Sequence, residues 1–404
     1  MQSEGVTTPE RRRTALYFLF ALPGLAIASW VVRTPAIRDA IDASIETMGI
    51  VILGVSIGSM VGILCSPALI ARFGTRAVTG VGTTSAVLSM PVVGLGAEAG
   101  AAAVVAVGLC LFGIGMGGSE VAINTEAADV ERALETSVLP AVHGCFSLGT
   151  LVGALIGVGC GLADVSIGLH LVLIGVLGVP VLFTQVRHLS PPSRSDAIAK
   201  GTTPAGWLWR DGRLLVIGVV VLAMALAEGA ATDWLPLVMV DGHGASAVAG
   251  SLVYAAFAAA MTVGRFSGGC FLDRFGRTVV FRSGAAIAAA GIGCIVLLDS
   301  QALAAMGALA WGLGLSLGFP IAISAAGDSG SDPAARVAFV ATMGYTAFLV
   351  GPPMLGFIGE DLGLRSALMF PLALVILAFL LASALGARDG RVREEDSAGA
   401  VRPG

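Results

Sequence analysis

The stretch GCFLDRFGRTVVF, residues 269–281, places Asp273, Arg274 and Arg277 between two long apolar runs. A related stretch, PALIARFGTRAV at residues 67–78, contains the same Arg-Phe-Gly core. The two cores lie 202 positions apart, which is half of the 404-residue chain. The sequence therefore predicts a duplicated unit.

The composition is that of a membrane protein. Apolar residues make up 56% of the chain and charged residues only 12%, so a soluble globule would expose large apolar patches. The net charge of −4 offers no basic platform for nucleic acid. The cysteines lie within or beside apolar runs without a Cys-x-x-Cys motif, so we expect neither disulfides nor a metal site. They are Cys65, Cys110, Cys145, Cys160, Cys270 and Cys294.

The lengths of the apolar runs predict the membrane spans. A bilayer core of roughly 30 Å needs about 20 apolar residues per helix. Twelve such runs are predicted, near 14–36, 47–70, 76–96, 99–124, 137–160, 166–185, 213–238, 246–271, 278–297, 300–324, 337–358 and 365–386. The first run follows three arginines and lacks a small-residue cleavage site, so it is predicted to be an uncleaved helix.

The placement of basic residues predicts the orientation. With the amino terminus inside, only Arg33, Arg38 and Arg365 fall on the outer side, whereas nineteen Lys and Arg residues collect on the inner side. This distribution agrees with the positive-inside rule. We expect a multi-pass protein of the bacterial cytoplasmic membrane with both termini in the cytoplasm.

The longest polar connection divides the chain into two halves. Residues 186–212 are rich in Pro and Ser and join the sixth predicted helix to the seventh. We therefore expect a six-helix bundle at 1–185, a cytoplasmic linker at 186–212, a second six-helix bundle at 213–387 and a cytoplasmic tail at 388–404.

Further matches support the duplication. Trp30 in ASW corresponds to Trp234 in TDW, and GIGMGGSEVAINTEAAD ending at Asp129 resembles GLGLSLGFPIAISAAGD ending at Asp328. Parallel repeats of a six-helix unit occur in transporters, which bind substrate near the midplane between the halves. The fold class predicted is an all-α membrane protein of twelve helices in two pseudo-symmetric bundles.

These residues resemble the major facilitator superfamily over nearly the whole chain. That family has a cytoplasmic motif, Gly-x-x-x-Asp-Arg-x-Gly-Arg-Arg, between helices 2 and 3, and a weaker copy between helices 8 and 9. The second copy here retains five motif positions, and the first retains three but has Pro67 for Gly and Ala71 for Asp. The retained residues are Gly269, Asp273, Arg274, Gly276 and Arg277, and Arg72, Gly74 and Arg76.

The resemblance implies that these loops turn at glycine and that their charges clamp an inward gate, which Ala71 weakens in the first half. Within the superfamily, segments such as SWVVRTPAIRDAI and AEGAATDWLPLVMV look like a bacterial branch related to the fucose-permease group.

Glu228 is the first candidate for coupling. It lies near the middle of the seventh predicted helix, and an ionisable side chain at that depth costs roughly 2.5–3.5 kcal/mol on insertion scales. Such residues are functional candidates, so Glu228 either carries a proton or pairs with another helix to fix packing.

Asp233 and Trp234 follow on the same helix, and the repeat places Trp30 at the matching point of helix 1. Arg33 lies nearly one turn beyond Trp30. A pair between Arg33 and Asp233 or Glu228 would bind a polar substrate or lock the outer gate. The alternatives are that Arg33 extends to the water, that Asp233 is only an interface residue and that Trp234 anchors at the interface.

Two further pairs share helix faces at the inner half. Glu120 and Asn124 lie four apart on helix 4, and His143 and Ser147 lie four apart on helix 5. Glu120 and His143 would then form a proton relay, or all four would form a structural hydrogen-bond network at the inner gate. Glu126, Asp129, Glu131 and Asp328 are expected to pair with the arginine clusters instead.

The leading hypothesis is a secondary transporter that imports a small polar organic solute with protons by alternating access. Two alternatives remain open: an exporter, and a sensor that binds solute without transporting it. Ala154 replaces the Pro of the family's antiporter motif, which weakens the case for export. The sequence shows no nucleotide-binding motif and no nucleophile-base spacing, so an enzyme is not expected. We expect a monomer whose partners are solute, protons and lipid, without cofactor, metal or nucleic acid.

Overall fold

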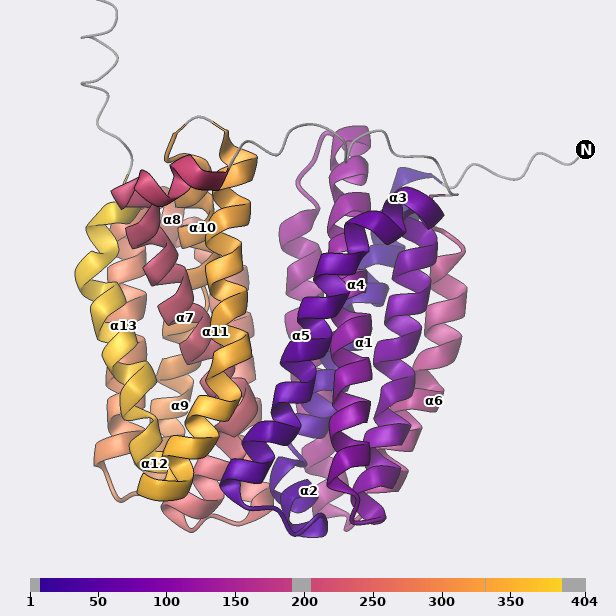
Figure 1. Cartoon of the computed structure of the whole chain (residues 1–404), viewed down its shortest axis with the longest axis vertical. Coiled ribbons are helices and arrows are strands. Elements are labelled where there is room, and N and C mark those ends of the chain that lie inside the picture. Colours follow the sequence, from indigo (N-terminus) through magenta and orange to yellow (C-terminus); the bar gives the residue numbers. More distant parts are fainter. Residues whose placement is uncertain (1–7, 191–204, 331, 387–404) are drawn as a thin grey trace, which may run out of the picture.

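The computed structural model describes residues 8–190, 205–330 and 332–386. Within these ranges the chain is helical and contains no β-strand. The helices form two groups that lie side by side, one built from the first part of the chain and the other from the second (Figure 1). This arrangement confirms the predicted all-α architecture of two bundles.

The first bundle contains six helical segments. They are α1 (Pro9–Val31), α2 (Thr34–Ala40), α3 (Ile45–Glu98), α4 (Ala102–Leu134), α5 (Leu139–Leu162) and α6 (Ile167–Val186). The predicted run 14–36 is interrupted at Val31, because Pro35 lacks a backbone N–H and begins the short helix α2. Serine side chains cap two of these helices: Ser44 accepts from the Thr47 N–H and Ser166 from the Leu169 N–H.

The second bundle repeats this order with more breaks. Its elements are η2 (Ala205–Arg210), α7 (Gly212–Leu237), η3 (Val238–Gly242), α8 (Ala247–Leu297), α9 (Gln301–Leu315), α10 (Gly318–Gly327), α11 (Pro333–Leu362), α12 (Leu364–Ala367), α13 (Met369–Leu381) and η4 (Ala382–Leu385). The predicted run 300–324 is split between α9 and α10 in the structure.

The long helices α3 and α8 each contain two membrane crossings. At about 1.5 Å per residue the 54 residues of α3 would extend far beyond a bilayer core of roughly 30 Å. The chain turns at Gly74 (φ 81°, ψ 164°) and at Gly276 (φ 74°, ψ 163°), a conformation that only glycine adopts readily. Ten described helices are long and apolar enough to span, and two of them are double, which accounts for the twelve predicted crossings.

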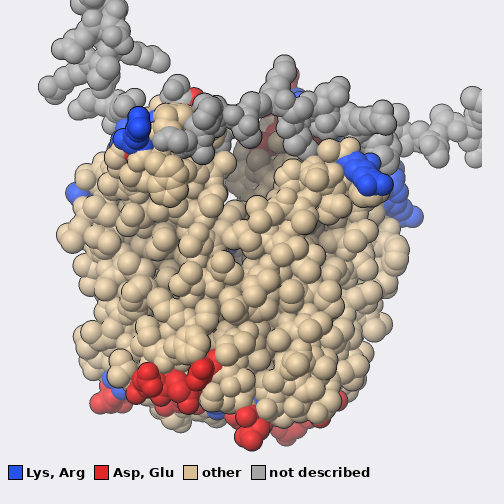
Figure 2. Space-filling view, in the orientation of Figure 1, with Lys and Arg blue, Asp and Glu red and all other residues tan. Residues whose placement is uncertain are grey.

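Charge distinguishes the two ends of the molecule (Figure 2). The end at which α1 begins, here called the arginine-rich end, carries basic residues from both bundles. The opposite end, here called the acidic end, carries most of the exposed carboxylates. By their positions at the ends and turns of the helices, described residues of the arginine-rich end include Arg11, Arg72, Arg76, Arg132, Arg187, Arg274 and Arg277, and those of the acidic end include Asp39, Glu46, Asp241, Asp299 and Glu360.

The bundles touch at the acidic end. Arg38 pairs with Asp241, and the backbone N–H of Glu46 donates to Glu360 at 3.1 Å. Deeper contacts run from the Ser56 hydroxyl to the Phe348 carbonyl, at 2.6 Å, and from the Ser251 hydroxyl to the Val32 carbonyl, at 2.5 Å. These contacts close the acidic end.

At the arginine-rich end the surface is hollowed between the bundles (Figure 2). Each ion pair between described residues there stays within one bundle. Arg12 pairs with Glu126 at 2.8 Å, Arg277 with Asp328 at 2.5 Å and Arg336 with Asp211 at 2.5 Å. The structure therefore represents a conformation with a cleft open toward the arginine-rich end.

The predicted linker at 186–212 falls largely on residues 191–204, which lie outside the described residues. The predicted tail at 388–404 also lies outside them. The boundaries 1–185 and 213–387 consequently stay a prediction, although the two groups of helices they enclose are present (Figure 1).

Candidate functional site

Arg265 of α8 connects the two bundles within the apolar interior. Its Nη2 donates to the Glu228 Oε1 of α7 at 2.9 Å, and its Nη1 donates to the Ser147 Oγ of α5 at 2.7 Å. The Arg265 and Glu228 side chains are 24% and 23% exposed, so both retain access to open space. The ion pair thus belongs to the second bundle, and the hydrogen bond to Ser147 extends it into the first.

Close packing of α5 on α8 brings Arg265 within reach of Ser147. The hydroxyl of Thr262 lies 3.3 Å from the Ser147 carbonyl. One helical turn away, a Cβ on Gly144 would lie 2.6 Å from the Phe266 ring, so the ring would have to shift to admit a side chain there. Small residues such as Gly144 thus allow the close approach that the side-chain bridge requires.

Arg265 was not among the residues singled out by sequence. The signal was present, because an arginine inside the predicted span 246–271 requires an anionic partner at membrane depth, and Glu228 lies in the preceding helix. Glu228 thus pairs with another helix, as one of its two interpretations predicts, and its side chain stays partly exposed. Its role as a proton carrier stays a prediction.

Glu120 and His143 do not form the predicted pair in the described structure. His143 packs edge-on against Phe20, with ring centroids 5.1 Å apart, and lies within electrostatic range of Arg265. Glu120 instead interacts electrostatically with Tyr345 of α11. The two groups therefore sit on different parts of the interior, and each lies near the opposite bundle.

Asn124 lies one turn from Glu120, and its side-chain oxygen is buried without a hydrogen-bond partner in the described residues. Asp233 makes no ion pair with a described residue, but it interacts electrostatically with Tyr254 of α8, as does Glu228. Three carboxylates, one arginine and one amide thus occur in the interior helices, contributed by both bundles.

The predicted contact of Arg33 with Asp233 or Glu228 is wrong. Arg33 donates from Nη2 to the Val165 carbonyl at 2.5 Å, within its own bundle. Because Arg265 occupies Glu228, the carboxylate needs no partner from the first bundle. Arg33 therefore fastens α5 and α6 to α1 near the acidic end.

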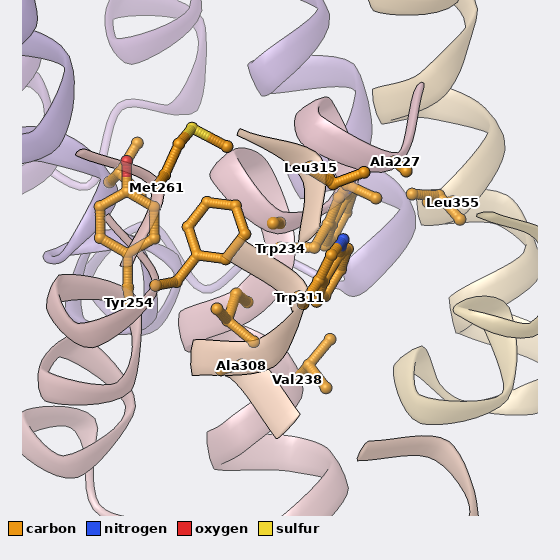
Figure 3. Close-up of a cluster of buried hydrophobic side chains, with 14 of the residues drawn as sticks. Ala227, Trp234, Val238, Tyr254, Met261, Ala308, Trp311, Leu315 and Leu355 are labelled. Carbon is orange, nitrogen blue, oxygen red and sulfur yellow. The ribbon is translucent and has the colours of Figure 1, made fainter. Parts of the chain in front are cut away.

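The two matched tryptophans are core residues. Trp30 and Trp234 are each 1% exposed, so neither anchors at the membrane–water interface. Trp234 lies beside Trp311 of α9 in a buried apolar cluster (Figure 3). The indole N–H groups of Trp30 and Trp234 are buried without a partner in the described part of the chain.

The two copies of the loop motif are placed at the arginine-rich end. Arg72 lies over the Phe73 ring at 5.2 Å and Arg274 over the Phe275 ring at 5.3 Å. Asp273 makes no ion pair with a described residue, and neither copy forms an ion pair with a described residue of the opposite bundle. With the cleft open at this end, no inter-bundle clamp is formed by Gly269, Asp273 and their neighbours among the described residues.

The acidic residues near these loops follow the prediction in three of four cases. Glu126 pairs with Arg12, Asp129 with Arg132 and Asp328 with Arg277. Glu131 instead accepts hydrogen bonds from the backbone N–H groups of Val138 and Leu139 and thereby caps α5. All four are structural contacts at helix ends.

Comparisons with known proteins agree with the fold. A family model described as Major Facilitator Superfamily matches residues 14–332. An uncharacterized MFS-type transporter of Yersinia pestis is 31% identical over 344 residues, which is 84% of this chain and 87% of that protein. Membrane protein MosC of Rhizobium meliloti is 27% identical over 369 residues, 90% of this chain and 88% of MosC.

Solved structures share the arrangement of helices. The nucleoside transporter NupG superposes with a TM-score of 0.72 at 13% identity and covers 93% of this chain and 100% of that one. A single-residue variant of the E. coli fucose:proton symporter FucP superposes with a TM-score of 0.64 at 17% identity, covering 93% of this chain and 98% of that one. At these identities the likeness concerns the fold.

Proposed function

The chain belongs to the major facilitator superfamily, and we propose that it imports a small polar organic solute together with protons by alternating access. Transport across a membrane follows from family membership. The proton coupling and the direction are our inference. The observation that supports proton coupling is the bridge from Glu228 through Arg265 to Ser147. This bridge joins an ionisable pair to the surface where the bundles separate.

In the proposed cycle, Glu228 is the proton carrier. When it is ionised it holds Arg265 through a charge-assisted hydrogen bond, which is stronger than a neutral one. Protonation of Glu228 removes the negative charge and frees donors of the guanidinium group. Arg265 then binds acceptor oxygens of the solute, and the tie to Ser147 weakens as the bundles move.

The remaining interior residues complete the proposed site. Glu120 and His143 serve as further proton-accepting groups, and Asn124 and Asp233 offer polar contacts from opposite bundles. Trp30, Trp234 and Arg33 support the walls around them. The monomer proposed here needs only solute, protons and lipid.

The direction of transport is inferred from charge and from helix α5. The positive-inside rule favours a cytoplasmic arginine-rich end in the bacterial inner membrane, so the open cleft would face the cytoplasm. Ala154 is buried in α5 where exporters of this family carry Pro. A fucose:proton symporter has the same fold, which is compatible with import.

Proteoliposomes with an internal pH dye test the proposal. Sugars, polyols and organic acids are screened with the wild type and Glu228→Gln at known orientation. We expect solute-dependent acidification of the compartment that receives the solute, and its loss in Glu228→Gln. Glu98→Gln is the matched control, because Glu98 accepts from the Gly168 N–H at the acidic end and should leave coupling intact.

Three outcomes would contradict the proposal in different ways. Solute flux with no proton movement, unchanged in Glu228→Gln, would make Glu228 structural and the protein a uniporter. Proton movement opposite to solute movement would make it an exporter. Binding without flux in either direction would favour a sensor.

A further inference from the structure

A groove lies on the outer surface of the first bundle, away from the cleft between the bundles. It runs between the second half of α3 and α6 and has a volume of about 700 Å³. Its lining is largely apolar and includes Val81, Thr84, Leu182 and Phe183, with Arg76 at one end. Val81 is 72% exposed and Phe183 69% exposed, and such side chains on spanning helices face lipid.

The depth of the groove corresponds to one leaflet. Its α3 wall extends from Arg76 to Ser85, which is about 14 Å at 1.5 Å per residue. Half of a bilayer core of roughly 30 Å has nearly the same thickness. An acyl chain of the leaflet at the arginine-rich end would therefore fit along this wall, with its headgroup near Arg76.

Positive charge gathers where the headgroup would lie. His188, just beyond α6, interacts electrostatically with Arg187, Arg11 and Arg76, and no carboxylate takes part. Burial and these three cations lower the pKa of His188. Neither Arg76 nor Arg11 makes an ion pair with a described residue, so this charge has no counterion in the described part of the protein.

The second bundle shows that the duplicated fold does not itself require the groove. The position that matches Arg76 is Thr278, 202 residues later, which has no charge. There the chain after η4 lies close, since a Cβ on Gly386 would be 3.3 Å from the Thr278 hydroxyl. The arginine and the open groove thus occur together in the first bundle.

We propose that this groove binds an anionic phospholipid, with one acyl chain between α3 and α6 and its phosphate held by Arg76, Arg187 and Arg11. Basic pockets between spanning helices are suited to anionic headgroups, and apolar walls to the chain. The site is separate from Glu228 and Arg265, so it stands independently of the proposed transport cycle.

Native mass spectrometry of the full-length protein in detergent tests the proposal with phosphatidylglycerol and phosphatidylcholine of identical chains. We expect the wild type to retain phosphatidylglycerol preferentially. The double variant Arg76→Gln/Arg187→Gln should weaken its retention by about tenfold or more, since each arginine contributes to anionic-lipid binding. Val81→Trp should fill the groove and remove the bound lipid.

Matched variants separate this site from general lipid contact. Arg282→Gln removes a positive charge from the second bundle, and Val279→Trp enlarges a 54% exposed valine there. Both should retain phosphatidylglycerol like the wild type. If Val81→Trp does not elute as a folded monomer, Thr84→Phe fills the same groove.

Three results would overturn the proposal. Equal retention of both lipids would show no preference for an anionic headgroup. Retention that survives the groove-filling variants would place the lipid elsewhere. Displacement of the retained lipid by glycerol phosphate alone would indicate a site for a free phosphate ester, without a chain in the groove.

Discussion

Gly49 of α3 and Gly356 of α11 meet across the two bundles with no side chain between them. A Cβ on Gly356 would lie 3.0 Å from the Gly49 Cα, and a Cβ on Gly49 would lie 3.1 Å from the Gly356 Cα. Both neighbours are backbone atoms, which cannot turn aside as a side chain can. The closed acidic end therefore depends on two positions that lack a side chain.

Gly49→Leu should drive the bundles apart at the acidic end. Overpacking costs about 1–3 kcal/mol, and here the cost falls only on the conformation in which the bundles touch. Distances between spin labels on the two bundles at this end should lengthen. Gly159→Leu is the control, because no atom outside its own helix lies within 4 Å of a Cβ there. Unchanged distances in Gly49→Leu would show that the contact does not limit closure.

Arg265→Gln should destabilise the protein more than the double variant Glu228→Gln/Arg265→Gln. The single change leaves Glu228 without its partner, at a cost of roughly 1–3 kcal/mol, whereas the double change leaves two neutral amides. Thermal unfolding in detergent measures both. The double variant should regain stability but not solute-dependent proton movement.

The control for this cycle is Ser147→Ala, which removes the other acceptor of Arg265 and leaves the ion pair. We expect a smaller loss of stability than in Arg265→Gln. Equal losses in the single and double variants would mean that Glu228 without Arg265 costs no stability, against the proposed bridge.

Much of the fold could be predicted because it depends on period and repetition. The apolar runs predicted the crossings, and the Arg-Phe-Gly cores located Gly74 and Gly276, whose matching backbone angles confirm the repeat. The break after Val31 was missed. The apolar run continues past Val31 in the sequence, but Pro35 interrupts the helix there.

The site was less predictable, because it depends on which helix faces meet. Glu228 was recognised by the cost of a charge at membrane depth, and the same argument applied to Arg265 would have supplied its partner. Arg33 was assigned to the wrong neighbour. Its choice of the Val165 carbonyl depends on the turn between α5 and α6, which no spacing in the sequence reveals.

Acid should weaken the ion pair between Asp211, at the start of α7, and Arg336. Burial by itself would raise the pKa of the Asp211 carboxyl, but hydrogen bonds from Arg336 and from the Leu214 N–H lower that pKa overall. A carboxyl with a depressed pKa stabilises the fold above its unfolded value of about 3.9, and this contribution is lost as pH falls from there through the folded pKa.

Thermal unfolding between neutral and acidic pH should therefore show a smaller acid-dependent loss in Asp211→Asn than in the wild type. Asp211→Asn should also be less stable at neutral pH. Asp164→Asn serves as the control, since Asp164 makes no ion pair with a described residue and lies at the acidic end. Identical pH profiles for the wild type and Asp211→Asn would remove Asp211 as a source of acid sensitivity.

The glycines of the loop motif should differ in their tolerance of a side chain. Gly74 and Gly276 adopt positive φ with extended ψ, a region that costs other residues about 1–3 kcal/mol. Gly269 belongs to the same motif but has no such φ, and no atom outside its own helix lies within 4 Å of a Cβ placed on it. Gly276→Ala should therefore lower the unfolding temperature, and Gly269→Ala should not. A loss in Gly269→Ala equal to that in Gly276→Ala would mean that the motif's glycines are required by another conformation, in which the arginine-rich end closes.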